Sequence, residues 1–459
     1  MPTGPIIEAL RREAHVLHQD DRLDRIIDQI GDASIVLLGE ATHGTREFYR
    51  VRAEICKRLI TEKGFDAIAV EADWPDALHV NRFIKTGTDV IGNMHSGDSP
   101  RAMRTADEAL HGFERFPQWM WRNTEIVELV GWLRQHNMQV ADDRDKVGFF
   151  GLDLYSLRSS MEAVVRYLSQ VDPEAARRAR ARYACFDHLA EDPQRYGYAA
   201  SFGMRKDCEN EVVRQLVELT QNGAPLFSDS GPDQTDELFH AQQNARVAQN
   251  AEAYYRAMFQ GRNESWNLRD QHMAETLAAL RTHIIDRKGR RPKIAVWAHN
   301  SHLGDARATE MGEHGQLNLG QLVREQYGMR DAFLLGFSTH TGTVTAASDW
   351  DAPSETKNVR PSHPDSYERV FHDTGLGNFI VPLRDNAELR GLLEEQRLER
   401  AIGVIYLPES ERVSHYFYAS LSRQFDAVIH LDETHAIRPL EKAAAHHEGE
   451  LPETYPTGI

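Results

Sequence analysis

Short apolar runs recur along the chain, each bounded by polar residues, glycines or prolines. They are brief, rich in β-branched or aromatic residues and without helical spacing, which is typical of strands buried on both faces of a sheet. We expect strands in the segments SIVLLGE at 34–40, DAIAVEAD at 66–73, VGFFGLDL at 147–154, KIAVWAHN at 293–300, AFLLGFST at 332–339, AIGVIYL at 401–407 and DAVIHLD at 426–432.

A helical pattern separates the first two of these runs. The segment EFYRVRAEICKRLITEK at 47–63 has helical spacing and is followed by Gly64, which suits the end of a helix. The order strand, helix, strand predicts an α/β fold with a mainly parallel central sheet flanked by helices.

The middle of the chain has a different composition. Residues 155–290 are rich in Ala, Arg, Glu and Gln and contain no pattern typical of a strand. We therefore predict an all-helical insert at 155–290 within an α/β core domain formed by residues 1–154 and 291–459.

Composition and charge narrow the class of function. The 459 residues carry a formal net charge of −17, whereas nucleic-acid binding concentrates Lys and Arg on one face, so we expect no nucleic-acid partner. No apolar run approaches the roughly 20 residues that span a bilayer. A secretion signal is a basic segment followed by an apolar one, and the start of this sequence does not show that pattern. We expect a cytoplasmic protein that contacts no membrane.

The three cysteines are consistent with that compartment. Cys56, Cys185 and Cys208 match neither a disulfide framework nor a zinc-binding pair in their spacing. We expect them to be reduced and packed in the interior.

Ionisable residues follow four of the predicted strands. Glu40 and His43 follow the first, Glu71 and Asp73 the second, Asp153 the third, and His299 and His302 the fourth. Because the carboxyl ends of parallel strands meet at one edge of a sheet, we expect these groups to share a site. For each carboxylate taken alone, a helix cap or a turn is the alternative interpretation.

The segment GEATHGTREF offers a general base. His43 lies in the turn before the helix that starts near Thr45, and nearby carboxylates can hold its tautomer. The first N–H groups of that helix could stabilise an oxyanion. Arg46 and Arg52 on the same helix could hold a carboxylate ionised or polarise a carbonyl. The structural alternative is a capped helix with a buried histidine and two solvated arginines.

The remaining motifs give less information about the reaction. The chain contains no G-x-S-x-G nucleophile elbow, no phosphate-binding P-loop and no dinucleotide G-x-G-x-x-G, which argues against serine α/β-hydrolases, NTPases and dehydrogenases. We interpret His415, His430 and His435 as structural. Trp74 and the aromatics of FERFPQWMW could line an apolar cleft, although core packing is favoured for Phe116, Trp119 and Trp121.

Together the motifs resemble those of the erythromycin esterase family. VLLGEATHGTREFYRVRAEICKRLI, IAVEADWPDA, VWAHNSHLGDA and SHYFYASLSRQFDAVIHLDET match that family in residues and order, over roughly 30–435. The resemblance implies an α/β core with a helical lobe and a cleft between them. It assigns the base to His43, the acidic residue to Glu71, the helix arginine to Arg52 and a second histidine to His299.

Further residues follow from the same motifs. Glu40 and His302 lie within them, and Arg269 in ESWNLRDQHMAE resembles a family arginine near the cleft. We predict that water attacks a carboxylic ester, that His43 takes its proton, and that Arg52 or backbone N–H groups receive the oxyanion. The residues expected to bind substrate are His302, Arg269, Asp73, Trp74 and Arg46.

Three alternatives stay open at this point. The first is a metallohydrolase in which His43, Glu40, Glu71 and His299 bind a divalent ion such as zinc, whereas the favoured mechanism needs no cofactor. The second is a non-catalytic protein that binds a small molecule. The third is an enzyme that processes a polyketide or polysaccharide. The expected partner is a small-molecule ester, with macrolides and antibiotic resistance as candidates; the oligomeric state is open.

Overall fold

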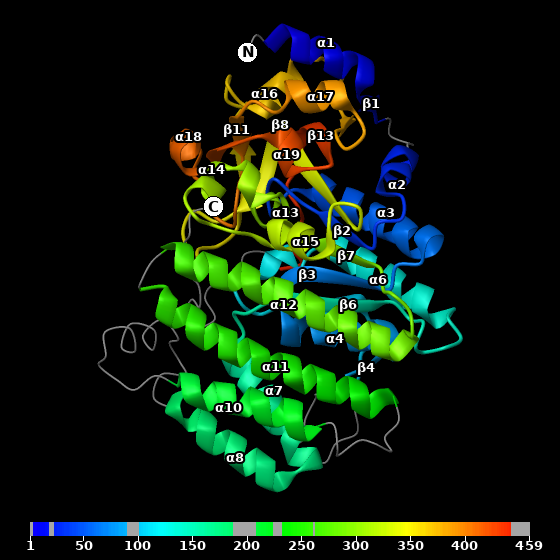
Figure 1. Cartoon of the computed structure of the whole chain (residues 1–459), viewed down its shortest axis with the longest axis vertical. Helices are drawn as coiled ribbons and strands as arrows, with labels where there is room; N and C mark the ends of the chain where they lie inside the picture. Colours follow the sequence, from blue (N-terminus) through cyan, green and yellow to red (C-terminus); the bar gives the residue numbers. More distant parts are fainter. Residues whose placement is uncertain are drawn as a thin grey trace.

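A mixed sheet lies at the centre of the molecule (Figure 1). The computed structural model describes residues 3–17, 23–89, 101–186, 208–223, 232–259 and 262–441. Within them, nine strands join in the order β1-β10-β13-β8-β2-β7-β3-β6, and β9 pairs with β8. The strands are β1 (His15–Val16), β2 (Ile35–Leu38), β3 (Ala67–Asp73), β6 (Gly148–Asp153), β7 (Ile294–Trp297), β8 (Ala332–Ala346), β9 (Glu355–Val359), β10 (Phe379–Pro382) and β13 (Ala427–Thr434).

The inner part of this sheet is parallel. β13, β8, β2, β7, β3 and β6 run in one direction, while β10 pairs antiparallel with β13 and with β1, and β9 pairs antiparallel with β8. The predicted α/β class with a mainly parallel sheet is therefore confirmed. Two small sheets join β4 (Thr88–Asp89) to β5 (Arg101–Ala102) and β11 (Arg397–Arg400) to β12 (Tyr416–Ala419).

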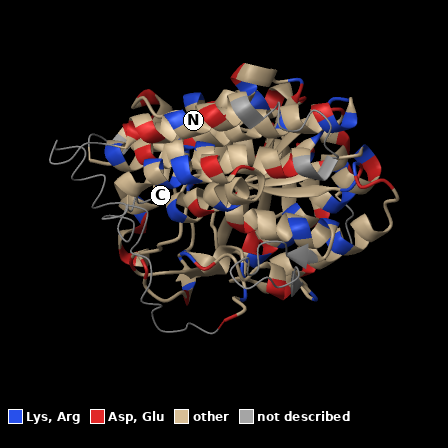
Figure 2. Ribbon diagram, turned by 90° about the horizontal axis from the view of Figure 1, so that it is seen from below, with Lys and Arg blue, Asp and Glu red and all other residues tan. Residues whose placement is uncertain are grey.

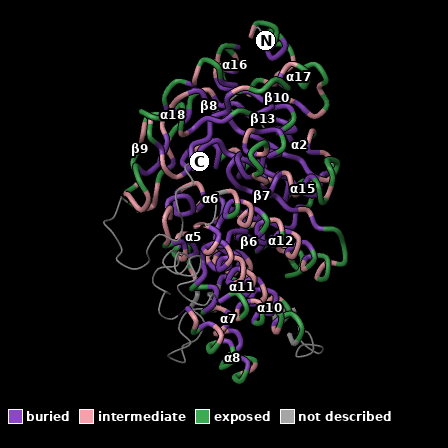
Figure 3. Tube along the Cα trace, turned by 60° about the vertical axis from the view of Figure 1, so that its left-hand side comes forward, coloured by how far each residue is buried: buried purple, intermediate pink, exposed green. Residues whose placement is uncertain are grey.

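Helices cover both faces of the sheet. In β2 the side chains of Val36 and Leu38 belong to one apolar cluster, and those of Ile35 and Leu37 to another, because successive strand residues point to opposite faces. Strands buried on both faces must be apolar at every position, which is why the pattern is visible in the sequence. The buried trace through the sheet is continuous in Figure 3.

The first face is packed by helices from the first third of the chain. They are α2 (Asp24–Ile30), α3 (Arg46–Lys63), α4 (Trp74–Lys85), α5 (Ala106–Ala109), η1 (Gln118–Met120) and α6 (Thr124–Met138). Trp119 and Trp121 belong to this core, as favoured from the sequence. The predicted helix at 47–63 is confirmed as α3, with Gly64 in a left-handed conformation at its end.

The second face is packed by α1 (Thr3–Glu13), α12 (Arg262–Lys288), α15 (Leu319–Tyr327), α16 (Tyr367–His372), α17 (Ala387–Leu392) and α19 (Leu421–Gln424). The remaining short elements are α13 (Asn300–Leu303), η4 (Ala306–Ala308), α14 (Glu310–Glu313), η5 (Pro408–Ser410) and α18 (Glu411–Ser414).

The described part of residues 155–290 contains helices and no strand. α7 (Leu157–Val171), α8 (Pro173–Tyr183), η2 (Ala184–Phe186), α10 (Glu209–Gly223) and α11 (Pro232–Ala257) share an apolar cluster of their own in the lower part of Figure 1. α12 packs instead on the sheet, through Met273, Leu277 and Leu280. The domain boundaries and the cleft stay predictions.

The strand predicted at 401–407 is wrong. This segment makes only single bridges, from Ile402 to Thr42 and from Ile405 to Ala347. Its backbone therefore joins two different loops and forms no continuous ladder, although its side chains are as apolar as those of a strand. The pairing places it against the turn that carries His43, whose N–H donates to the Ile402 carbonyl at 3.3 Å.

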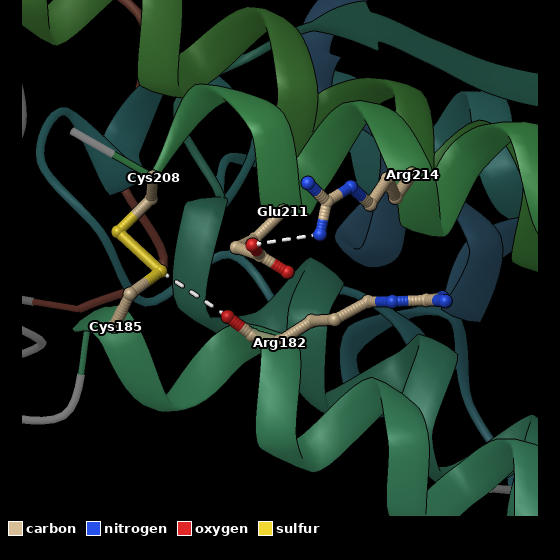
Figure 4. The surroundings of a disulfide bond; sticks show 5 residues. All are labelled: Arg182, Cys185, Cys208, Glu211 and Arg214. Carbon is tan, nitrogen blue, oxygen red and sulfur yellow. Dashed lines mark hydrogen bonds and ion pairs between the residues drawn. A yellow bond between two sulfur atoms is a disulfide. The ribbon is translucent and has the colours of Figure 1, made fainter.

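The prediction of three reduced cysteines is wrong for two of them. Cys185 in η2 and Cys208, just before α10, form a disulfide with their Cα atoms 6.0 Å apart (Figure 4). They are 23 residues apart in sequence, and only the packing of α8 against α10 brings them together. Cys56 is free and buried in α3. None of the helices described combines the length and the apolar character that crossing a bilayer demands.

The turn that follows β2 is packed closely at Gly44. A Cβ atom at this position would overlap the Thr345 backbone, which itself donates an N–H to the Gly44 carbonyl at 3.0 Å. We expect Gly44→Ala to lower the free energy of unfolding by about 2 to 3 kcal/mol, because backbone cannot move aside as a flexible side chain can. Urea unfolding followed by circular dichroism measures the change.

Gly131 in α6 is the matched control. A Cβ atom there meets nothing within 4 Å, so Gly131→Ala should raise stability by a few tenths to about 1 kcal/mol through helix propensity. Equal unfolding midpoints for Gly44→Ala and the wild type would contradict the close approach.

Candidate active site

A buried ion pair holds His43 in place. Glu40, 2% exposed, follows β2, and its Oε1 accepts a hydrogen bond from His43 Nδ1 at 2.9 Å. Its Oε2 accepts from Arg52 Nη2 at 2.5 Å. The Arg52 guanidinium in turn contacts two rings that are nearly perpendicular to each other, 4.6 Å from the centroid of Tyr49 and 4.5 Å from that of Trp297. Because a carboxylate accepts at Nδ1, neutral His43 carries its hydrogen there and has its lone pair on Nε2.

His299 lies beside His43, with ring centroids 4.9 Å apart. Its Nδ1 accepts from the Ser301 N–H at 3.2 Å, at the start of α13. Burial lowers the pKa of His299 well below its ordinary value, and the charge of His43 lowers it further. His299 is therefore neutral, with its hydrogen on Nε2. That atom is buried and has no hydrogen-bond partner among the described residues.

Glu71 supports this loop from the end of β3. Its Oε2 accepts from the His299 N–H at 2.9 Å, and its Oε1 accepts from Arg269 Nη2 at 2.6 Å. Burial raises the pKa of Glu71, but the charges of His302, Arg269 and His43 lower it more, and the net pKa lies well below the ordinary value. Glu71 is a fixed negative charge behind His299.

Arg269 from α12 joins this carboxylate to a second one. Its Nε and Nη2 donate to Asp153 at 3.0 and 2.7 Å, which makes a bidentate pair, and its Nη1 lies 3.1 Å from His302 Nε2. The guanidinium also covers the ring of Tyr155, 4.9 Å from its centroid. Two carboxylates and one guanidinium thus link β3, β6 and α12.

His302 closes the cluster. Its Nδ1 lies 2.9 Å from Asp270 Oδ2, and its ring stacks on Trp266 at a centroid distance of 4.5 Å. Burial lowers the pKa of His302, but Asp270 and Glu71 raise it more, so the net pKa is above the ordinary value. The two carboxylates on either side of His302 thus favour its protonated form, while the Arg269 guanidinium opposes it.

The structure brings together most of the residues expected from the sequence, but not all. Asp73 bonds Arg115, at 2.5 Å to Nη2, next to the cluster. Trp74 is buried in the core, stacked on Phe150 at a centroid distance of 5.8 Å. Arg46 bonds its neighbour Glu47 at 3.1 Å. The substrate contacts expected of Trp74 and Arg46 stay predictions.

The sequence predicts some of the residues that shape the site only in part. Asp153 is expected at the shared strand edge without a specific role, and Asp270 directly follows Arg269 in the sequence. Glu399 gave no signal, because it lies in the small β11–β12 sheet. It is buried, and its Oε1 lies 3.5 Å from Nδ2 of Asn300, the residue after His299. Burial and the nearby Glu368 raise the pKa of Glu399 to about 8.

The two carboxylates named as alternative metal ligands already have other partners. Both oxygens of Glu40 and both oxygens of Glu71 accept hydrogen bonds from Arg52, His43, Arg269 and the His299 N–H. Among the residues with described positions, no group of three or more His, Cys, Asp or Glu is arranged to hold a metal ion. The side chains as they lie here do not form a ligand set.

Comparison with known proteins bears on this arrangement. The family model described as erythromycin esterase matches residues 60–434, which is most of the chain. The chain belongs to the erythromycin esterase family. The resemblance noted in the sequence is thereby confirmed, and membership indicates a hydrolase that acts on a small molecule.

The relatives are distant from this chain. Erythromycin esterase type II of Escherichia coli is 23% identical over 441 residues, which cover 87% of this chain and 96% of that protein. The crystal structure of a succinoglycan biosynthesis protein has a TM-score of 0.74 at 21% identity, covering 95% of this chain and 98% of that one. An erythromycin esterase mutant in its open conformation has a TM-score of 0.59 at 16% identity, covering 90% and 93%.

The family match starts after the most distinctive part of the site. Glu40, His43 and Arg52 precede residue 60, so the matched range does not cover them. Their roles rest on the geometry described above.

Two buried carboxyl groups should change stability with pH in opposite directions. The pKa of Glu71 is lowered on folding, so its contribution is present above the ordinary value of 4.5 and is lost as the pH falls below it. Glu71→Gln should lower the free energy of unfolding at pH 7 by a few kcal/mol, with the deficit constant above about pH 4.5 and shrinking as the pH falls below that value.

Glu399 should show the reverse behaviour. Its pKa rises from 4.5 to about 8 on folding, so the wild type loses stability as the pH rises between these values. Relative to the wild type, Glu399→Gln should gain stability from pH 5 to 8 and level off above. Urea unfolding of the wild type and both variants from about pH 3 to about pH 9 is the measurement, and parallel pH dependence of the two variants would contradict the assignments.

Proposed function

We propose that this chain hydrolyses a carboxylic ester, including the ester of a macrolactone, by direct attack of water. The observation that carries the proposal is the buried Arg52–Glu40–His43 relay, in which Glu40 bonds both other side chains. This arrangement leaves the lone pair of His43 Nε2 available, as a general base requires.

The charges balance without a covalent intermediate. Water attacks the ester carbonyl carbon, its proton passes to His43 Nε2, and the imidazolium is stabilised by ionised Glu40. Arg52 keeps Glu40 ionised, since an unpaired buried carboxylate would take up a proton. Collapse of the tetrahedral intermediate then breaks the acyl–oxygen bond, and His43 returns the proton to the leaving alkoxide.

His299 is suited to receive the developing oxyanion. Its Nε2–H is buried beside His43 and lacks an acceptor among the described residues. A preorganised donor in a buried site is worth about 10² to 10³ in rate. Arg52, expected from the sequence to take this role, is 1% exposed and bonded to Glu40, so we propose a positioning role for it.

Glu71, Arg269 and Asp153 hold His299 in position beside His43. Glu71 accepts the His299 N–H, and Arg269 fixes Glu71 against Asp153. We propose that Arg269 and His302 contact the substrate from this side, and that a macrolide ring is one candidate substrate. Acylated polysaccharide is a second candidate substrate, because the succinoglycan biosynthesis protein has the same fold.

The cytoplasmic location stays a prediction. Disulfide bonds such as Cys185–Cys208 are rare in the cytoplasm, so cell fractionation is the experiment that tests this location.

His43→Ala tests the base directly. We expect turnover to fall by about 10² to 10⁴-fold, because the proton acceptor is removed while the fold is kept. The assay is mass spectrometry of erythromycin, other macrolides, acetylated oligosaccharides and simple esters incubated with each protein, where hydrolysis adds one water. His372→Ala is the control, because His372 is a partly exposed histidine bonded to Asp432.

The outcomes separate the hypotheses. Hydrolysis that persists in His43→Ala would refute the assignment of the base. A ligand that binds the wild type tightly and is recovered unchanged would favour the non-catalytic binding protein.

A metal requirement has its own test. Because the partners of Glu40 and Glu71 are arginines, histidine and backbone N–H, we propose a metal-free reaction and expect dialysis against EDTA to leave activity within about twofold. Elemental analysis of the dialysed protein is the control. Loss of activity on chelation with recovery on adding Zn²⁺ or Mn²⁺ would favour the metallohydrolase.

A further inference from the structure

A cavity lies outside the candidate active site. Its volume is about 310 Å³, and it opens between η4, α15, α17 and α19. Met329 and Asp426 in its wall precede β8 and β13, so it lies at the amino ends of strands, whereas His43 and His299 follow carboxyl ends. The volume falls in the range of small-molecule sites, roughly 300 to 1,000 Å³. None of its lining residues belongs to the candidate active site.

Positive charge is concentrated in this cavity. Its wall contains five arginines and two aspartates, namely Arg307, Arg324, Arg384, Arg390, Arg423, Asp305 and Asp426. The chain as a whole carries a net charge of −17, and basic and acidic residues are interspersed along the ribbon in Figure 2. An excess of three positive charges in one cavity departs from that pattern.

Both aspartates in the wall are paired with Arg307, Arg324 or Arg384. Asp305 bonds Arg307 at 2.7 Å and Arg324 at 3.2 Å. Asp426 bonds Arg324 at 3.2 Å and Arg384 at 2.9 Å. Each carboxylate therefore has two guanidinium partners, and no acid in the wall remains for the outer arginines.

Three donor groups in the wall lack an acceptor. Arg390 and Arg423 are exposed, and their side chains make no hydrogen bond or ion pair with any residue whose position is described. Arg324 is 3% exposed in its side chain, and its Nε is buried without a hydrogen-bond partner. A buried N–H without an acceptor is costly, so an acceptor from outside the chain fits this position.

We propose that this cavity binds a small molecule with two or more negative charges, carried by phosphate or carboxylate groups. Guanidinium groups bind both kinds of anion through paired hydrogen bonds. Two exposed arginines at the mouth and one buried donor in the wall suit an anion with separated charges. The ligand is distinct from the proposed ester substrate, since none of the lining residues of its cavity belongs to the candidate active site.

Isothermal titration calorimetry with pyrophosphate and with citrate tests the proposal. Both are titrated into the full-length protein at a constant ionic strength of about 0.15 M, so that general screening is the same throughout. We expect saturable binding of at least one of them with a stoichiometry of one. The Arg390→Glu/Arg423→Glu double variant should weaken it by at least about tenfold, because two attractive charges become repulsive.

The matched control is Arg25→Glu/Arg50→Glu, which makes the same change in net charge at exposed arginines of α2 and α3. Its affinity should stay within about twofold of the wild type. Circular dichroism shows that both variants fold. The proposal is overturned if neither anion binds saturably at concentrations up to about 10 mM, or if both double variants weaken binding equally. Binding of pyrophosphate alone identifies phosphate as the preferred group, and binding of citrate alone identifies carboxylate.

Discussion

A carboxylate removed from water keeps its charge only if cations and hydrogen-bond donors surround it, and Glu40 is such a carboxylate. Arg52 supplies the cation and His43 the donor, so the three side chains form one unit from β2, its turn and α3. Removing Arg52 would leave the buried Glu40 carboxylate without its cation, so stability depends on the same ion pair that orients His43. The nearly perpendicular rings of Tyr49 and Trp297 pack against the guanidinium.

The turn that carries His43 is held by segments distant in the sequence. Gly44 accepts N–H groups from Thr345 and Ile437, and the His43 carbonyl accepts from the Tyr49 hydroxyl at 2.9 Å. The irregular segment 401–407 pairs with the same turn. Rigid packing on all sides is what a histidine base needs, because an error of about 1 Å in its position reduces the rate steeply.

The fold and the centre of the site could be predicted from the sequence for the same physical reason. Strands buried on both faces must be apolar throughout, and ionisable residues just after them must gather at one edge of a parallel sheet. The pattern of residues alone therefore places Glu40, Glu71 and His299 together. Trp74 obeys the same pattern but turns into the core, because side-chain direction is set by packing against Phe150.

Contacts made only by the tertiary structure could not be predicted in this way. Glu399 approaches Asn300 from a small separate sheet, and Cys185 meets Cys208 through the packing of two helices. The apolar segment 401–407 has the composition of a strand, but its backbone forms single bridges with two different loops and does not pair with one neighbouring strand. The spacing of residues along the sequence does not predict these pairings.

The tautomer of His43 is the central claim about chemistry, and nitrogen NMR of ¹⁵N-histidine-labelled protein measures it most directly. Neutral His43 should carry its hydrogen on Nδ1 in the wild type and lose this preference in Glu40→Gln, while His299 carries its hydrogen on Nε2 in both. Hydrogen on Nε2 of His43 in the wild type would contradict the account, because the atom assigned to accept the proton of water would have no lone pair.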